Sequence, residues 1–530
     1  MAQFYAQPLP SSYPAVMPLL DALNFAEIVE TIVPKRWNNG VTHADALTVL
    51  LLMILDYGGP RPISRVEEWA EQFGTDLLLG IDPAQLHDDK IGHALDALVP
   101  VTEAGECDLS PIVALHHHLA HSAITRYGIN TQVLHYDFTD IGLHGAFEDS
   151  ELARRGKGPT RRQLQLGLNV TAGSAFPILA TVHPGATNHT VSVPQNLAAL
   201  MQRLPGQSFC VVTDAAGGSY DNFVAYNRAG QHFITSRQLR GWEQEKMRAI
   251  PREQFELAEH RSRTGDRFFV HRCDWPIHPQ NKPHELVLSA VVVLSENKLR
   301  SDQKKARQQL RKLLGRLVQI AGYAGGRGQY SRPDYVRAMA EKALAKYTDA
   351  GRFVRLEVSD EPALSWTVDR AAFARYRRVL GRYVLFTNLP EDAYSAEYVL
   401  EQYRGRHVVE ASYRQLKSEL EIAPLHMHKD NRLLAMAAIW VIALMVLSLL
   451  QLLARRAGLE TKRGQALTGR ELLQNLLAVT AVTCRIDGQV RASVGPLSEP
   501  AERYLGAMGF PDAGHWLKVP PIDLQLISGI

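Results

Sequence analysis

The chain has 530 residues, of which 46% are hydrophobic and 21% charged, a globular composition that excludes general disorder and leaves room for roughly three domains. The 58 Lys and Arg residues nearly balance the 55 Asp and Glu residues, so the net charge of +3 excludes a uniformly basic surface for nucleic acid. The four cysteines are scattered and form no CxxC pair, which supports neither a zinc knuckle nor a disulfide framework and suits a reducing cytoplasm.

The N-terminal quarter is predicted to be helical. Helical patterns cover residues 41–57, 64–74 and 83–99. We expect an all-helical domain over residues 1–128, which would suit DNA binding, although helical bundles serve many purposes. His116, His117, His118 and His121 lie on one predicted helix, and because consecutive residues point in different directions we expect a polar surface there. The first residues lack the features of a secretory signal.

From about residue 130 the pattern changes to strands alternating with helices. Polar and apolar residues alternate over 131–140, which places Asp137 and Thr139 on one face of a strand. The next strand to end in an acid closes with Asp214, before a flexible loop. The predicted order is strand, strand, strand, helix, strand, helix, strand, over residues 131–140, 161–173, 176–185, 192–204, 208–218, 219–230 and 231–237.

A helix predicted over residues 403–420 carries an unusual set of side chains. Tyr403, Arg406, Glu410 and Lys417 are spaced i, i+3, i+7 and i+14, so at about 100° per residue they share one face. A carboxylate between two cations and a phenol could hold a metal ion while the cations grip phosphates. A solvated face with i,i+4 ion pairs is the alternative interpretation.

Residues 433–454 form an uncharged run of 22 residues, long enough to cross a membrane. Gln451 and Ser448 interrupt the run, and no second span accompanies it. We therefore favour a buried core helix and expect no membrane partner.

Three acidic residues could complete a metal site. Asp137 and Asp214 end predicted strands, and Glu410 lies on a later helix that could pack beside the sheet. Three carboxylates that converge would repel one another unless a cation lies between them, and hard oxygen ligands select Mg²⁺ or Mn²⁺. Two such ions per site suit phosphoryl chemistry, since one activates the nucleophile and the other stabilises the leaving oxygen. Strand-end turn acids are the simpler interpretation of each aspartate alone.

The strand order, the two aspartates and the Y-x2-R-x3-E-x6-K spacing resemble the bacterial insertion-sequence DDE transposases with the YREK signature (IS4-like superfamily, IS1634-type group). The resemblance spans roughly residues 40–455. The segments LHDDKIGHALDAL (86–98) and PLHMHKDNRLLAMAAI (424–439) also look like parts of this family. HPGATNHTVS (183–192) departs from it, because His189 stands where an acid is common.

The resemblance implies an α/β fold: an RNase H-like catalytic core with a mixed five-stranded sheet and flanking helices. A β-rich insertion would interrupt this core. The implied domains are a helical N-terminal domain for DNA ends (1–128), the core (129–240 and 381–456), an α+β insertion domain (241–380) and a C-terminal region for DNA binding or dimerisation (457–530).

The resemblance also implies roles for single residues. Asp137, Asp214 and Glu410 would be the catalytic metal ligands. Tyr403, Arg406 and Lys417 would contact DNA phosphates through a neutral donor, a bidentate fork and a point charge. Thr139 and Asn222 would support the site, with helix packing as the alternative for Asn222.

Two further features are candidates for DNA contact. A basic helix over residues 296–316 has eight Lys or Arg against two acids, and its candidate contacts are Lys304, Lys305, Arg311 and Lys312. A solvated amphipathic helix is an equally open interpretation. Trp242 could stack on an extruded base, although a core position is the simpler interpretation.

The implied function is a transposase that cleaves insertion-sequence ends and joins the 3′ hydroxyl to target DNA. Its partners would be double-stranded DNA, namely terminal inverted repeats and target, and a second protomer in the DNA complex. The alternatives are an RNase H-like nuclease without strand transfer, a DNA-binding protein derived from a transposase, and a membrane-anchored protein.

Overall fold

The computed structural model describes residues 4–34, 40–57, 62–145, 147, 150–155, 162–187, 189–261, 265–278, 286–421, 427–461, 464–477, 479–486 and 489–522. The side chain of His189, which departs from the family pattern, lies outside the described part. The chain is a mixed α/β protein with two compact units. The first unit contains residues 1–213, 228–231 and 405–530, and the second contains residues 214–227 and 232–404.

The strands of the first unit surround β2 (Val133–Gly142). Strand β2 pairs antiparallel with β4 (Arg162–Thr171) and parallel with β6 (Cys210–Val212), so the sheet is mixed. Strand β4 also pairs with β3 (Arg154–Arg155) and in a hairpin with β5 (Pro177–Pro184). These pairings confirm the predicted strands in this part. Strand β6 is shorter than predicted, because the chain leaves the sheet after Val212.

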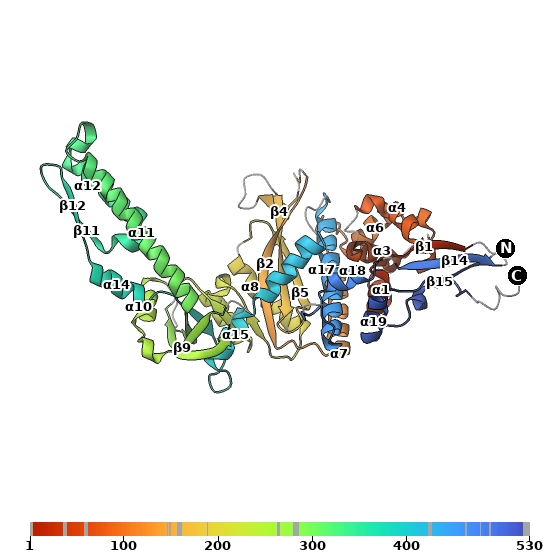
Figure 1. Cartoon of the computed structure of the whole chain (residues 1–530). Helices are drawn as coiled ribbons and strands as arrows, with labels where there is room; N and C mark the ends of the chain where they lie inside the picture. Colours follow the sequence, from red (N-terminus) through yellow and green to blue (C-terminus); the bar gives the residue numbers. More distant parts are fainter. Residues whose placement is uncertain are drawn as a thin grey trace. The chain divides into compact units, whose positions relative to one another are not determined.

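The apolar run predicted near residues 433–454 forms α17 (Asp430–Arg456), which packs beside α7 (Ser110–Tyr127) in the first unit (Figure 1). Within the described part, α17 is the one helix long and apolar enough to cross a membrane, and 89% of its most apolar window is buried. Its polar residue Ser448 donates a hydrogen bond to the carbonyl of Ala175, in the β4–β5 turn. These contacts agree with the predicted core helix.

The N-terminal region holds the predicted helices, but it is not all helical. Strand β1 (Phe4–Pro8) pairs with β14 (Thr480–Ile486), and β14 pairs with β15 (Gln489–Val494). The partner of β1 lies some 480 residues away, so local periodicity could not reveal it. The helices are α1 (Tyr13–Ala22), α2 (Phe25–Ile32), α3 (His43–Leu55), α4 (Val66–Phe73), α5 (Thr75–Leu79), α6 (Asp88–Leu98) and α7; α18 (Gly469–Asn475) and α19 (Glu499–Ala507) follow near the C-terminus.

The prediction of a polar surface for the histidines of α7 was wrong for His116. Its side chain is 5% exposed, and its Nε2 lies 3.3 Å from the carbonyl oxygen of Ala438 on α17. Burial is the main cause that lowers the pKa of His116 to about 4, followed by the charge of Arg203. This histidine is therefore a neutral core residue.

The strands of the second unit follow the order β7 (His232–Ser236), β13 (Arg382–Thr387), β10 (Leu286–Ser295), β9 (Arg267–Ile277) and β8 (Glu256–Arg261). Helices α9 (Tyr220–Arg228), α10 (Gly241–Ala249) and α15 (Ala396–Arg404) belong to the same part of the chain. Each of these strand pairs that the structure describes is antiparallel.

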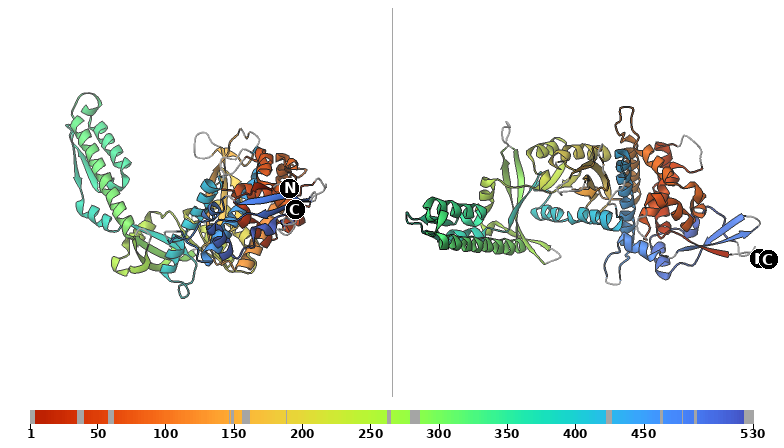
Figure 2. Two further views of the ribbon diagram at one scale, coloured as in Figure 1. Left: turned by 45° about the vertical axis from the view of Figure 1, so that its right-hand side comes forward. Right: turned by 90° about the horizontal axis from the view of Figure 1, so that it is seen from above.

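A helical arm extends this second unit (Figure 2). It is built on the 28-residue helix α11 (Glu296–Tyr323), which packs against α12 (Pro333–Lys346) around a small core that includes Leu313 and Val336. The arm also holds α13 (Thr348–Gly351), the hairpin β11 (Val354–Val358) and β12 (Leu364–Val368), and α14 (Arg370–Arg378). The description of residues 241–380 as β-rich was therefore wrong, because its longest elements are helices, which accompany strands in this segment.

Candidate active site

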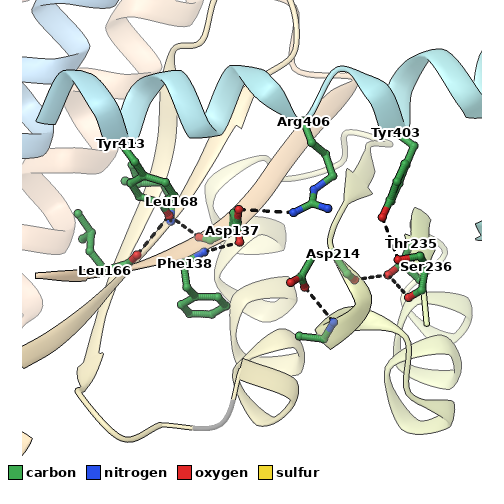
Figure 3. Close-up of polar contacts among 11 residues, drawn as sticks. Asp137, Phe138, Leu166, Leu168, Asp214, Thr235, Ser236, Tyr403, Arg406 and Tyr413 are labelled. Atoms are coloured by element: carbon green, nitrogen blue, oxygen red, sulfur yellow. Dashed lines mark hydrogen bonds and ion pairs between the residues drawn. The ribbon is translucent and has the colours of Figure 1, made fainter. Parts of the chain in front are cut away.

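Asp137 lies in the middle of β2, not at its end as predicted, because β2 continues to Gly142 beside β4. The pairing with β6, by contrast, stops at His135 and Val212. The Asp137 carboxylate accepts a hydrogen bond from the backbone N–H of Phe138 and forms a 3.5 Å ion pair with Arg406 (Figure 3). Both side chains are mostly buried, with 21% and 17% of their surfaces exposed. Asp137 and Arg406 are thus two predicted site residues that the first unit brings together.

Tyr413 anchors the helix that follows Arg406. It lies on α16 (His407–Arg414), and its hydroxyl contacts the backbone carbonyl of Asp137 and accepts a 3.0 Å hydrogen bond from the N–H of Leu168 (Figure 3). The same hydroxyl lies 3.2 Å from the carbonyl of Leu166. Burial, followed by the charge of Asp137, raises the pKa of Tyr413, so this phenol stays protonated. One buried hydroxyl therefore joins α16 to β2 and β4.

Glu410 lies on the exposed side of α16, three residues before Tyr413. Because residues three apart are neighbours on a helix, the anchored phenol fixes the part of α16 that bears Glu410. Sequence reasoning missed Tyr413. A tyrosine three residues after an acid is a weak signal, and the backbone groups that it contacts belong to strands some 245 residues earlier.

The expected single helix over residues 403–420 is broken. Helix α15 ends at Arg404, and Arg406 is the residue immediately before α16, where its side chain makes no capping hydrogen bond. After Arg414 the chain forms a π-helical turn, Gln415–Glu419, which contains Lys417. The single 100° spacing therefore does not hold across the segment, and the four-residue stripe as predicted was wrong in its geometry. Lys417 is exposed, yet desolvation of its ammonium lowers its pKa, an effect that Asp140 opposes.

His135 lies two residues before Asp137 on the same face of β2 and is fully buried. Burial is the largest cause that lowers its pKa to about 4, and the charges of Arg406 and His407 lower it further. The neutral imidazole thus adds no positive charge beside Asp137 at neutral pH.

Asp214 begins the second unit, two residues after β6 ends. Its side chain caps the short turn at Ala215–Gly217 by accepting a 2.8 Å hydrogen bond from the N–H of Ala216, and its carbonyl accepts one from Thr235. In the same unit the hydroxyl of Tyr403 lies 2.8 Å from that of Ser236, next to Thr235 on β7 (Figure 3). Tyr403 and Asp214 therefore contact neighbouring residues of β7, namely Ser236 and Thr235.

The remaining candidates have different surroundings. Asn222 is 1% exposed and donates to the carbonyl of Gly217, so it secures the loop after Asp214. Thr139 is half-buried on β2. Trp242 is 38% exposed at the start of α10, beside His278, so the interpretation as a core tryptophan was wrong.

The carboxylates offer the hard oxygen donors that Mg²⁺ and Mn²⁺ prefer, so their chemistry fits such an ion. Within the described residues, no three His, Cys, Asp or Glu side chains gather as a group that could hold a metal. The three acids belong to different units, with Asp137 and Glu410 in the first and Asp214 in the second. Their convergence stays a prediction.

The arm is strongly basic. Residues 296–380 contain 19 Lys and Arg against 9 Asp and Glu, a net charge of +10, whereas the rest of the chain carries −7. The predicted contacts on α11 are exposed, namely Lys304, Lys305, Arg311 and Lys312. We call residues 296–380 the basic arm. The near-neutral total charge therefore hides a local cationic surface.

Comparisons with known proteins give the family. Residues 130–446 match a family model described as a transposase DDE domain. The chain belongs to the DDE transposase family. Residues 12–105 match a domain of unknown function (DUF4277), and no curated protein matches the chain.

Among solved structures, the chain is similar to a cryo-EM structure of the piggyBac transposase synaptic complex with hairpin DNA. The two share 9% sequence identity at a TM-score of 0.38, over 99% of this chain and 87% of the other. The family model alone carries the assignment, which places this DDE transposase among the proteins of DNA transposition.

Proposed function

We propose that this chain is the transposase of a bacterial insertion sequence in the IS1634-type group with the YREK signature. It would bind the terminal inverted repeats, cleave the phosphodiester bond at each end and transfer the 3′ hydroxyl to target DNA. The protein would work in the cytoplasm as a homodimer on DNA. Its core would be RNase H-like, with the domain boundaries at residues 128, 240, 380 and 456 expected from the sequence.

The observation that carries this proposal is the attachment of α16 to β2 at Asp137. The hydroxyl of Tyr413 reaches the carbonyl of Asp137 itself, and Glu410 is three residues from Tyr413 on the same helix. Two acids 273 positions apart in the sequence are therefore tied to one buried phenol. Such an arrangement suits a site that must hold carboxylates in fixed positions.

The strand register supports the inclusion of Asp214. In the parallel pair β2–β6, His135 lies opposite Val212, and Asp137 and Asp214 each follow this pair by two residues. Both acids thus follow the carboxyl end of the paired stretch of these two parallel strands, although β2 itself continues beside β4. Ligand sites of α/β proteins lie beyond the carboxyl ends of parallel strands. Asp137, Asp214 and Glu410 would hold two Mg²⁺ or Mn²⁺ ions, which would supply Lewis-acid stabilisation of the phosphoryl oxygens.

The chain's own cations and phenol would hold the DNA strand. Arg406 would leave its ion pair with Asp137 for a phosphate oxygen and form a bidentate contact. Tyr403 and Lys417 would add a neutral donor and a point charge. The basic arm would neutralise phosphates further along the duplex, because its exposed cations need no specific geometry.

The test is cleavage of labelled element-end DNA with Mg²⁺ by the full chain and by Asp137→Ala, Asp214→Ala and Glu410→Ala. We expect each substitution to lower the cleavage rate on the order of 10³-fold or more, since several kcal/mol of transition-state stabilisation are lost. DNA-end binding should stay within a few-fold. Three variants that all cleave at the wild-type rate would refute the assignment.

A second assay separates transposition from simple nuclease activity. Pre-cleaved ends with a free 3′ hydroxyl are offered together with target plasmid, and joined products are counted. Cleavage without joining would favour an RNase H-like nuclease. A matched control is Glu421→Gln, an exposed acid eleven residues after Glu410, which should leave both reactions unchanged.

A further inference from the structure

A cavity of about 750 Å³ lies in the first unit, lined by residues of α7, α8 (His189–Arg203), β5 and α17. Apolar side chains dominate its wall, among them Ile112, Leu179 and Leu434. Val113, also in the wall, is 53% exposed, so the cavity opens to solvent. Its volume is in the range of small-molecule sites, which combine an apolar wall with a few polar groups.

Arg203 is the charged group of this wall. Its side chain is 7% exposed, and its Nη1 atom is buried without an acceptor among the residues that the structure describes. Among the residues that the structure describes, no Asp or Glu lines this cavity. Burying a cation without a hydrogen-bonded counter-charge costs free energy. An anion that pairs with the Arg203 guanidinium would offset this cost.

The other titratable groups near Arg203 do not supply that partner. Four histidines line the same cavity, namely His116, His117, His118 and His183. Burial followed by the charge of Arg203 lowers the pKa of His116 and His117. A protonated histidine would repel the guanidinium, and a neutral one carries no negative charge. Arg203 therefore contributes a cation to a mainly apolar wall in which the described lining residues supply no negative charge.

We propose that this cavity binds a small amphipathic monoanion, whose carboxylate pairs with the Arg203 guanidinium and whose apolar body lies against Leu179 and Leu434. The guanidinium can donate two parallel hydrogen bonds to one carboxylate, and both partners would be shielded from water. The apolar wall would remove the ligand's hydrocarbon from water at the same time. This site is separate from Asp137, Asp214 and Glu410 and does not depend on the proposed transposition.

The test uses calorimetric titration of the full chain with sodium decanoate and, separately, with decanol. Decanoate should bind, and decanol should bind at least tenfold more weakly because it leaves the cation unpaired. The substitution Arg203→Met keeps a long apolar side chain and should weaken decanoate at least tenfold while leaving decanol within about twofold. Arg456→Met, which removes an exposed arginine of α17 outside the cavity, should change neither affinity.

A second variant keeps the proposal testable if Arg203→Met does not fold. Ala199→Leu adds bulk to the wall from α8 and should weaken decanoate while Arg203 remains. The proposal is overturned if the wild-type chain does not bind decanoate, or binds decanol equally well. Unchanged decanoate affinity in folded Arg203→Met or Ala199→Leu would also overturn it.

Discussion

The surroundings of Asp137 and the basic arm are built in opposite ways. Near Asp137, one buried phenol contacts backbone groups of two strands, and one ion pair is mostly shielded from water. On the arm, the cations lie on exposed surfaces around a separate small core. The expected function of the first region thus depends on the position of single atoms, whereas that of the basic arm depends on its total charge.

Among the effects on DNA affinity, the largest should come from removing charge on the arm. The substitutions Lys304→Gln, Lys305→Gln, Arg311→Gln and Lys312→Gln, made together, should make the slope of log K against log salt less negative by about 3 to 4. Affinity for DNA at low salt should fall roughly 10²-fold. Fluorescence anisotropy over a salt series measures both quantities.

The matched control keeps the charge and changes the geometry of the charged groups. It combines Lys304→Arg, Lys305→Arg and Arg311→Lys and leaves Lys312 unchanged. If total charge is what matters, this variant binds as the wild type does. An unchanged salt slope in the glutamine variant would instead show that the four side chains do not contact phosphates.

An effect on stability, not on DNA affinity, is expected from His116, a buried residue of the first unit. Its folded-state pKa, about 4, lies below the ordinary value of 6.5, because burial and then Arg203 disfavour the charged form, while the Ala438 carbonyl opposes this. Above pH 6.5 the histidine is neutral in both states. As the pH falls from 6.5 to about 4, only the unfolded chain takes up the proton, so stability should fall by up to about 3 kcal/mol.

Chemical denaturation of His116→Gln at several pH values tests this. The glutamine can still donate to the Ala438 carbonyl but does not titrate, so the pH dependence between 6.5 and 4 should flatten. His118→Gln, at an exposed position on the same helix, should keep the wild-type profile. Equal profiles for all three chains would contradict the buried neutral histidine.

The smallest effect in stability should follow Tyr413→Phe. Loss of the hydroxyl leaves the Leu168 N–H without its acceptor, at a cost of about 1 to 2 kcal/mol. Because α16 would be held less firmly, cleavage should fall more than DNA binding does. Thermal unfolding and a cleavage assay measure the two effects, and Tyr504→Phe, an equally buried tyrosine of α19, is the control for cleavage. Wild-type cleavage in Tyr413→Phe would show that the anchor does not position the site.

Periodic sequence patterns predicted the elements that depend on local information. The alternation around Asp137 and the apolar run of α17 correspond to β2 and a buried helix. The break at Gly405–Arg406 was not predicted, although Gly405 is a poor helix former and was a local signal for it. The π-helical turn at Lys417 was not predicted, because lysine suits a continuous helix and tertiary packing decides otherwise. The role of Tyr413 was missed for the same reason.

The candidate site rests on residue types and on the family spacing, and the roles of its residues stay predictions. The sequence could name Asp137 and Glu410, but it could not show that α16 attaches at the Asp137 carbonyl. Likewise, the net charge of the whole chain concealed the +10 of the basic arm, because the compensating acids lie elsewhere. Long-range contacts and charge segregation are properties of the fold that no single segment contains.

The pairing of β1 with β14 has a consequence for synthesis on the ribosome. Phe4 pairs with Cys484 in the sheet, and this pair can form only after Cys484 has been synthesised. The first unit therefore cannot finish folding until nearly the whole chain has emerged. The second unit lies between residues 214 and 404 and is available for folding much earlier. Closing so long a loop slows folding more than it lowers stability. Newly made molecules would therefore acquire the arm before they complete the unit that holds Asp137 and Glu410, which delays any cleavage until translation is almost over.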